Sequence, residues 1–174
     1  MTNSVKRGNR WLAWLFPRLE NREPGLMGGQ QNHLTMYDTI LVGTDGSPSA
    51  NRAIVHALDH AENYEADLHG IYVVDIQRFP EPALSSAELS TVECEDYGSD
   101  LLDDIGKRAG DLDITFVGEC CHGLPHEEII SYADEIDADM IVLGFQGLSH
   151  RRGETIGSVT ERVVRSAGRP VLVV

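Results

Sequence analysis

Three glycines and a serine near the carboxyl end of the chain have the types and the spacing that suit anion binding. Gly144 and Gly147 form a G-x-x-G pair, and nine residues separate this pair from Gly157-Ser158. Glycine lets the backbone approach a ligand closely and adopt φ values that side chains disfavour. The first turn of a helix adds N–H groups without intrahelical partners, at the positive end of the helix dipole. The pattern therefore predicts a cradle for a phosphate or another anion, to which Ser158 adds a hydroxyl donor.

The neighbouring sequence predicts which elements hold this loop. An apolar run at 140–143 precedes it and is typical of a buried strand, and an amphipathic run at 159–167 follows it and is typical of a helix. The alternative is an ordinary glycine-rich connection whose helix is capped by Ser158. A nine-residue insertion is longer than most strand-to-helix connections, and long ordered loops are commonly functional, which favours the anion cradle.

Strand and helix patterns alternate through the rest of the chain. Predicted strands cover residues 37–43, 68–74, 114–121, 139–143 and 170–174, and predicted helices begin at Ser47-Pro48, within the loosely patterned segment 76–110, at 123–128 and at 158. The last helix is predicted to bury Val159, Val163, Val164 and Ala167. This alternation predicts an α/β domain with an open parallel sheet and right-handed crossovers.

The end of the first predicted strand carries a second set of polar residues, Thr44-Asp45. Ligands of parallel α/β sheets bind beyond the carboxyl ends of the strands, where the strand order reverses. If the first and fourth strands are neighbours, Asp45 faces the glycine loop across that crevice. The phosphates would then lie at the glycine loop and the nucleoside toward Asp45, which can accept hydrogen bonds from ribose hydroxyls or a base amine. The alternative for Asp45 is a local role as a capping or Asx-turn residue.

Charge and composition narrow the classes of function. The net charge is −14, and residues 36–174 hold 26 acidic against nine basic side chains, which argues against nucleic-acid binding. Only Lys6 and Lys107 are lysines, and such an acidic, lysine-poor composition predicts a halophilic archaeon as the source. The odd count of three cysteines favours a reducing cytoplasm over a disulfide framework. No apolar run approaches the length of a membrane span.

Residues 1–35 differ from the remainder. They hold five basic and two acidic side chains, an apolar patch at 11–16 and several prolines and glycines. We predict a disordered N-terminal extension, or a segment that arises from the choice of start codon, since Met36 opens the first strand. The alternative is a helix that docks on a membrane surface or a partner. The predicted domain therefore covers residues 36–174.

The sequence assigns no metal ligand and no catalytic residue. Cys120-Cys121-His122 lie on a predicted strand, where successive side chains point to opposite faces and cannot converge on one ion. Cys94 has no placed base, and the glycine loop lacks the lysine of a Walker A motif. Whether the protein is an enzyme stays open at this point.

Several stretches together resemble the universal stress protein family, in its ATP-binding type. They are residues 40–47, 72–75 and 123–129, and the G-x-x-G-(nine)-G-S loop together with 170–174, so that the resemblance covers about residues 36–174. It implies a Rossmann-like, adenine-nucleotide α hydrolase-like fold with five parallel strands in the order 3-2-1-4-5, helices on both faces, and a homodimer through the last strand. It also implies ATP, with Mg, in contact with Thr44, Asp45, Val73, Leu143, Gly144, Gly147, Gly157, Ser158, Val159 and Thr160.

One departure from the family pattern concerns Phe145-Gln146, because members often carry a small residue and then His or Arg there. Gln146 brings no charge, which weakens phosphate attraction. His150, Arg151 and Arg152 lie in the same loop and either compensate or form an exposed basic turn. The leading hypothesis is a cytoplasmic, ATP-binding regulatory dimer. The alternatives are a dimerisation module that has lost its nucleotide and a slow ATP hydrolase that uses Arg151 and Arg152.

Overall fold

The computed structural model describes residues 36–75, 84–148 and 156–174, with the backbone alone for 84–92. The predicted N-terminal extension and the basic residues His150, Arg151 and Arg152 lie outside the described residues. Strands and helices alternate in the described part, in the order β1 (Thr39–Gly43), α1 (Pro48–Tyr64), β2 (Asp67–Asp75), α2 (Leu84–Gly110), β3 (Phe116–Gly123), α3 (Pro125–Glu135), β4 (Met140–Leu143), α4 (Ser158–Ser166) and β5 (Val171–Val173).

The strands form one five-stranded sheet in the order β3-β2-β1-β4-β5, and every neighbouring pair is parallel. The predicted α/β class and the strand order implied by the family resemblance are therefore confirmed. Because β1 pairs with both β2 and β4, the order reverses at β1. The carboxyl ends of β1 and β4 thus lie side by side, as the prediction for Asp45 required.

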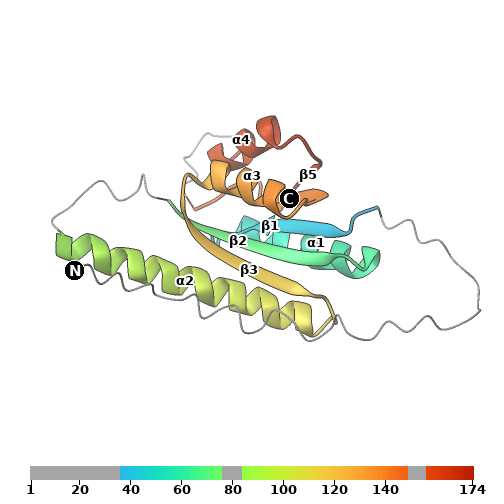
Figure 1. Cartoon of the computed structure of the whole chain (residues 1–174), viewed down its shortest axis with the longest axis horizontal. Helices are drawn as coiled ribbons and strands as arrows, with labels where there is room; N and C mark the ends of the chain where they lie inside the picture. Colours follow the sequence, from blue (N-terminus) through green and yellow to red (C-terminus); the bar gives the residue numbers. More distant parts are fainter. Residues whose placement is uncertain (1–35, 76–83, 149–155) are drawn as a thin grey trace, which may run out of the picture. The chain divides into compact units, whose positions relative to one another are not determined.

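Helices cover both faces of the sheet (Figure 1). One face packs against α1 and α2, where Ile40, Ile54 and Ile105 belong to a single buried cluster. The other face packs against α3 and α4, where Leu41, Ile129 and Val163 belong to a second cluster. Successive residues of β1 alternate between these clusters, because side chains along a strand point to opposite faces.

The first helix begins as predicted. Ser47 is the N-cap residue, its hydroxyl oxygen accepts a hydrogen bond from the N–H of Ala50 at 3.1 Å, and Pro48 occupies the first helical position. Its buried face is mostly alanine, with Ala53, Ala57 and others in the core. These small side chains allow α1 to lie close to the sheet and to the turn that follows β1.

Two predictions about the elements differ from the structure. The third strand runs from Phe116 to Gly123, so that both its start and its end lie two residues later in the chain than predicted. The prediction that the last helix buries Val164 is wrong, because this side chain is 48% exposed. Thr160 is buried instead, next to Val163 on the inner side of this nine-residue helix.

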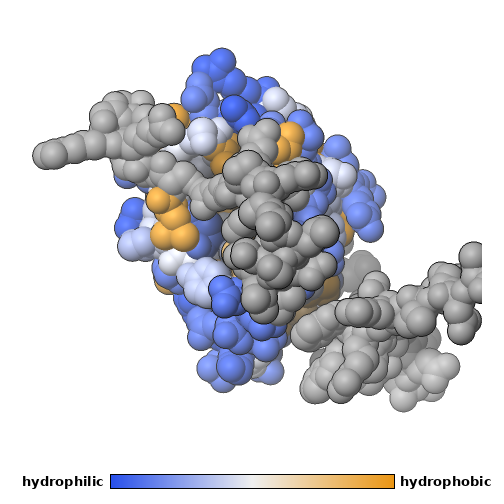
Figure 2. All heavy atoms as spheres, turned by 90° about the vertical axis from the view of Figure 1, so that its left-hand side faces the viewer, coloured by the Kyte–Doolittle hydropathy of each residue, from blue (hydrophilic) through white to orange (hydrophobic). Residues whose placement is uncertain are grey.

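On the face that Figure 2 shows, hydrophilic residues predominate and hydrophobic side chains are scattered among them.

Candidate functional site

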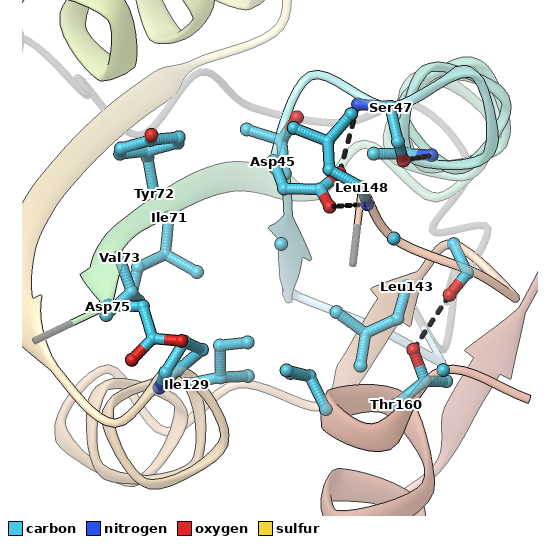
Figure 3. A pocket seen from close by; sticks show the side chains of 18 of the residues that line it. Asp45, Ser47, Ile71, Tyr72, Val73, Asp75, Ile129, Leu143, Leu148 and Thr160 are labelled. Carbon is cyan, nitrogen blue, oxygen red and sulfur yellow. Dashed lines mark hydrogen bonds between the residues drawn. The ribbon is translucent and has the colours of Figure 1, made fainter. Parts of the chain in front are cut away.

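A cavity of about 520 Å³ opens at the carboxyl end of the sheet, where β1, β2 and β4 meet the first turns of α3 and α4. Its size falls in the range of about 300 to 1,000 Å³ that small-molecule sites occupy. All ten residues named for nucleotide contact from the sequence line it, namely Thr44, Asp45, Val73, Leu143, Gly144, Gly147, Gly157, Ser158, Val159 and Thr160. Figure 3 shows the β2 end and α3 on one side, with Leu143 and α4 on the other.

Asp45 joins the turn after β1 to the glycine loop. Its Oδ1 accepts a hydrogen bond from the N–H of Ser47 at 3.0 Å, which is the predicted Asx-turn geometry. Its Oδ2 accepts a second from the N–H of Leu148 at 2.7 Å, across the crevice (Figure 3). The local role and the position facing the loop, which were alternatives on the sequence, therefore occur together.

Two serines of the α1 N-terminus also hold the glycine loop, and sequence reasoning gave them no such role. The Ser47 hydroxyl donates to the carbonyl oxygen of Gln146 at 3.3 Å, and the N–H of Gln146 donates to the Ser49 hydroxyl oxygen at 3.3 Å. The Ser49 hydroxyl in turn donates to the carbonyl oxygen of Val174 at 3.1 Å. The signal in the sequence is the alternation of small polar residues at 45, 47 and 49, directly before the first helix.

The other end of the loop is the N-terminus of α4. Gly157 is the N-cap residue, and its N–H donates to the carbonyl oxygen of Phe145 at 2.8 Å. Ser158 is the first helical residue and not the cap, which corrects the capping alternative. The N–H groups of a first helical turn, here 158–160, have no carbonyl partner within their helix. Thr160 adds a buried hydroxyl that donates to the carbonyl oxygen of Gly144 at 2.8 Å.

Two of the three glycines have a packing role that the sequence did not predict. None of them has a positive φ angle, so the expected backbone conformation is wrong. A Cβ on Gly144 would lie 2.7 Å from the backbone nitrogen of Ala50, and a Cβ on Gly147 would lie 2.6 Å from Oδ2 of Asp45. At Gly157 the nearest atom would be 3.4 Å away, an ordinary contact. The first two glycines therefore make room for the protein's own atoms.

The remaining walls are mostly apolar. Ile71, Ile129 and Leu143 are buried and line the middle of the cavity, next to Val73 at the end of β2. Thr44 is also buried, and its hydroxyl oxygen accepts a hydrogen bond from the N–H of Gly46 at 3.2 Å. The cavity thus has an apolar side that suits a flat ring and a side of backbone amides that suits an anion.

The charged side chains among the described lining residues are two carboxylates, Asp45 and Asp75, and these residues include no lysine or arginine. Within the described part of the chain, an anion in this cavity would therefore be held by N–H and hydroxyl groups. The donor set at the α4 N-terminus and the adjoining apolar wall fit a nucleotide. A divalent cation bound with the phosphates would supply the positive charge that this wall lacks.

A model of the universal stress protein family matches residues 36–174. The chain belongs to this family. Universal stress protein MJ0531 of Methanocaldococcus jannaschii is 35% identical over 145 residues, which cover 83% of this chain and 85% of the relative.

Solved universal stress proteins have the same fold. One from Burkholderia pseudomallei is 30% identical, with a TM-score of 0.67, and the match covers 80% of this chain and 96% of that one. Another, solved in complex with cAMP, is also 30% identical, with a TM-score of 0.63, covering 80% of this chain and 97% of that one.

The cysteines of this universal stress protein are arranged as the strand geometry predicted. Cys120 packs against the cluster under α1 and α2, and Cys121 against the cluster under α3 and α4, so they point to opposite faces of β3. Burial raises the pKa of Cys121 to about 12, and the negative charge of the nearby Glu128 is the second cause. Burial also raises the pKa of Cys120. Among the described residues no group of three or more His, Cys, Asp or Glu could hold a metal ion. None of the described helices is both long enough and apolar enough to cross a membrane.

A hydrogen-bonded pair lies next to the cavity and links two of its walls. Nδ1 of His69 on β2 is 3.0 Å from the hydroxyl of Tyr132 on α3. Burial lowers the pKa of His69, although Asp67 acts in the opposite direction. Burial, followed by the nearby Glu119, raises the pKa of Tyr132 to about 12. Both groups are therefore neutral near pH 7, and the hydroxyl can donate to the imidazole nitrogen.

Proposed function

We propose that this chain is a cytoplasmic universal stress protein that binds ATP, with Mg, in the cavity at the carboxyl end of its sheet and acts as a regulatory homodimer. The observation that carries the proposal is the pairing of the first-turn amides of α4 with an apolar wall at the end of β2, in one cavity of nucleotide size. Neither feature alone is specific, because helix N-termini and apolar clefts are both common.

The two sides of the cavity divide the ligand between them. The phosphates lie at the N-terminus of α4, where the N–H groups of 158–160 and the helix dipole favour negative charge. The base lies against Ile71 and Ile129, and the backbone of Val73 offers it hydrogen bonds. Asp45 and Thr44 lie between these two regions, beside the sugar.

Mg would neutralise the triphosphate, which otherwise approaches a wall with two carboxylates in a protein of net charge −14. His150, Arg151 and Arg152 in the same loop either add positive charge or form an exposed basic turn, the two alternatives that the sequence leaves. The relative that was solved with cAMP supports an adenine nucleotide as the ligand class, because it is similar over 80% of this chain.

The proposed dimer forms through β5, which ends the sheet on the side opposite β3. The carbonyl oxygen of Pro170 and the N–H of Val174 bond to β4. Because peptide groups alternate in direction along a strand, those of Val171 and Val173 point away from β4. An exposed edge of this kind pairs readily with another strand, and a second copy of the chain offers one.

Isothermal titration with Mg-ATP, at both low and high salt, tests the nucleotide part of the proposal. We expect saturable 1:1 binding by the wild type and at least a tenfold loss with Gly147→Val, whose side chain would meet Asp45. Gly110→Val is the matched control, because a Cβ there would meet nothing within 4 Å and Gly110 does not line the cavity.

The outcomes separate the proposal from its alternatives. Absence of binding by the wild type in both salt conditions would overturn the proposal and leave the nucleotide-free module, which the uncharged Phe145-Gln146 pair favours. Equal binding by wild type and Gly147→Val would place ATP elsewhere. Release of inorganic phosphate from the same samples, above the level of the Gly147→Val variant, would support the slow hydrolase.

A further inference from the structure

We propose that Asp45 is a positioning residue that holds the glycine loop in shape for phosphate binding, and that it does not select the ligand by its sugar hydroxyls. The proposal rests on nucleotide binding in the cavity, as proposed above. It assigns to Asp45 a role that differs from the sugar or base contact expected from the sequence.

The first step is the use of both carboxylate oxygens by the protein itself. Oδ1 accepts from Ser47, two residues along the chain, at 3.0 Å, and Oδ2 accepts from Leu148, 103 residues along the chain, at 2.7 Å. Figure 3 shows the carboxylate between these two N–H groups. Hydrogen bonds to an ionised acceptor are roughly twice as strong as those between neutral groups. The carboxylate therefore ties Leu148 to the start of α1.

The second step concerns Gly147. Its hydrogen in place of a side chain leaves the space that Oδ2 of Asp45 occupies, since a Cβ there would lie only 2.6 Å from that oxygen. Gly147 and Asp45 are thus spatially complementary. A side chain at residue 147 would therefore have to displace the carboxylate from the position in which it bonds to Leu148.

The third step is that residues 144–148, which Asp45 holds, are hydrogen-bonded to the N-terminus of α4, where the anion-binding amides lie. On the α1 side, Gln146 bonds to both Ser47 and Ser49. On the α4 side, the carbonyl oxygens of the loop accept from the Gly157 N–H at 2.8 Å and from the Thr160 hydroxyl at 2.8 Å. Residues 144–148 are therefore held between two helices, and release at Asp45 would loosen the residues to which the α4 N-terminus is hydrogen-bonded. Such preorganisation strengthens binding by lowering the entropy lost when the ligand binds.

This role predicts a specific pattern of ligand dependence. If Asp45 acts through the phosphate loop, its loss lowers the affinity for ligands that carry phosphates and leaves the affinity for the nucleoside nearly unchanged. If Asp45 instead contacts the sugar, its loss weakens adenosine and ATP by the same factor, and removal of the 2′-hydroxyl from the ligand reproduces that loss.

Titrations of the full chain with adenosine, AMP, Mg-ATP and Mg-2′-deoxy-ATP distinguish the two. For Asp45→Asn we expect at least a tenfold loss of affinity for ATP, less than a threefold loss for adenosine, and an unchanged ratio of ATP to 2′-deoxy-ATP affinity. The wild type should bind 2′-deoxy-ATP within about threefold of ATP, since fewer lone pairs of Asp45 are left for the sugar. Asp59→Asn, at an exposed aspartate, is the matched control.

Gly147→Ala provides a second variant, which displaces the carboxylate of Asp45 while residue 45 itself stays an aspartate. It should repeat the Asp45→Asn pattern, with Gly110→Ala as its control. An equal loss for adenosine and ATP, or a wild type that prefers ATP over 2′-deoxy-ATP tenfold and loses that preference in Asp45→Asn, would overturn the positioning role.

Amide hydrogen exchange without nucleotide tests the fastening independently. The Leu148 amide should be protected in the wild type and exchange at least tenfold faster in Asp45→Asn, while the core amide of Leu41 stays protected and reports an intact fold. An unprotected Leu148 in the wild type would overturn the positioning inference alone. Failure of the wild type to bind any of the four ligands, with Leu148 protected, would overturn the proposed function and leave the fastening in place.

Discussion

Gly144 lies where the end of β4 comes closest to the start of α1. A Cβ built on it would be 2.7 Å from two backbone atoms, the nitrogen of Ala50 and the carbonyl carbon of Ser49. Backbone atoms cannot move aside as the end of a flexible side chain can. The space that a side chain would fill is therefore taken by the helix, and packing alone requires a glycine at this position.

Gly144→Ala should accordingly lower the free energy of unfolding by about 1 to 3 kcal/mol, the usual cost of forcing extra atoms into a packed region. Chemical denaturation in urea measures the change. Gly110→Ala is the matched control, and we expect it to be neutral or stabilising by up to about 1 kcal/mol, since it replaces a helical glycine in open space. Equal stability of wild type and Gly144→Ala would contradict this account.

The cysteines provide a natural probe of the cavity. Cys94 is half-buried and lines the cavity, whereas the pKa of Cys121 is raised to about 12 and its thiol stays protonated. Because the thiolate is the reactive form, Cys121 should react slowly with iodoacetamide at pH 8.

Mg-ATP should slow the alkylation of Cys94 severalfold by occupying the cavity and should leave the rate at Cys121 unchanged. Mass spectrometry of the labelled peptides gives both rates in one sample. An ATP effect on Cys121 but not on Cys94 would place the nucleotide outside this cavity.

At the scale of elements, the His69–Tyr132 pair joins β2 to α3 by a side-chain hydrogen bond. His69 lies two residues before Ile71, and Tyr132 three residues after Ile129, and both isoleucines line the cavity. Burial lowers the pKa of His69 below its ordinary value of 6.5. As pH falls through 6.5, the unfolded chain binds a proton at this residue before the folded chain does, so stability falls.

His69→Gln, which keeps a hydrogen-bond acceptor for Tyr132, should therefore lose less stability than the wild type between pH 7.5 and pH 5.5. Thermal unfolding at several pH values, with the ionic strength held constant, measures the difference. Parallel pH curves for the two proteins would show that His69 makes no contribution in this range.

The elements could be predicted from sequence because their signals are local. The Ser47 cap, the proline at 48 and the alanine spacing of α1 all lie within one helix, and the strand order followed from the family resemblance. The fastening of the glycine loop could not be predicted, because it joins Asp45 to Leu148 across 103 positions and depends on side-chain direction. The ten cavity residues were placed together correctly, whereas the reason for two of the glycines became clear only from the atoms around them.

At the scale of the whole molecule, charge and the open sheet edge are the main features. The halophilic source rests on composition alone, namely a net charge of −14 and two lysines in 174 residues, and it stays a prediction. The edge strand β5 consists of three half-buried apolar residues, and its open side faces no further strand in the described part of the chain. The proposed dimer would form at this edge.

Val173→Pro should convert the proposed dimer to a monomer. Proline removes an N–H that points away from β4, and proline is tolerated on edge strands in that orientation, so the monomer fold should survive. Sedimentation velocity measures the mass, with Val173→Ala as the control that keeps the N–H. A monomeric wild type, or a variant that remains dimeric, would count against the β5 interface.

The most direct test of the central claim is ¹⁵N–¹H NMR of the full chain titrated with Mg-ATP. The account predicts the largest amide shifts at Ser158, Val159 and Thr160, with a second group at Val73, because these groups line the phosphate and base sides of the cavity. Saturating ATP that leaves these four amides unmoved, or moves residues on the far edge of the sheet instead, would contradict it.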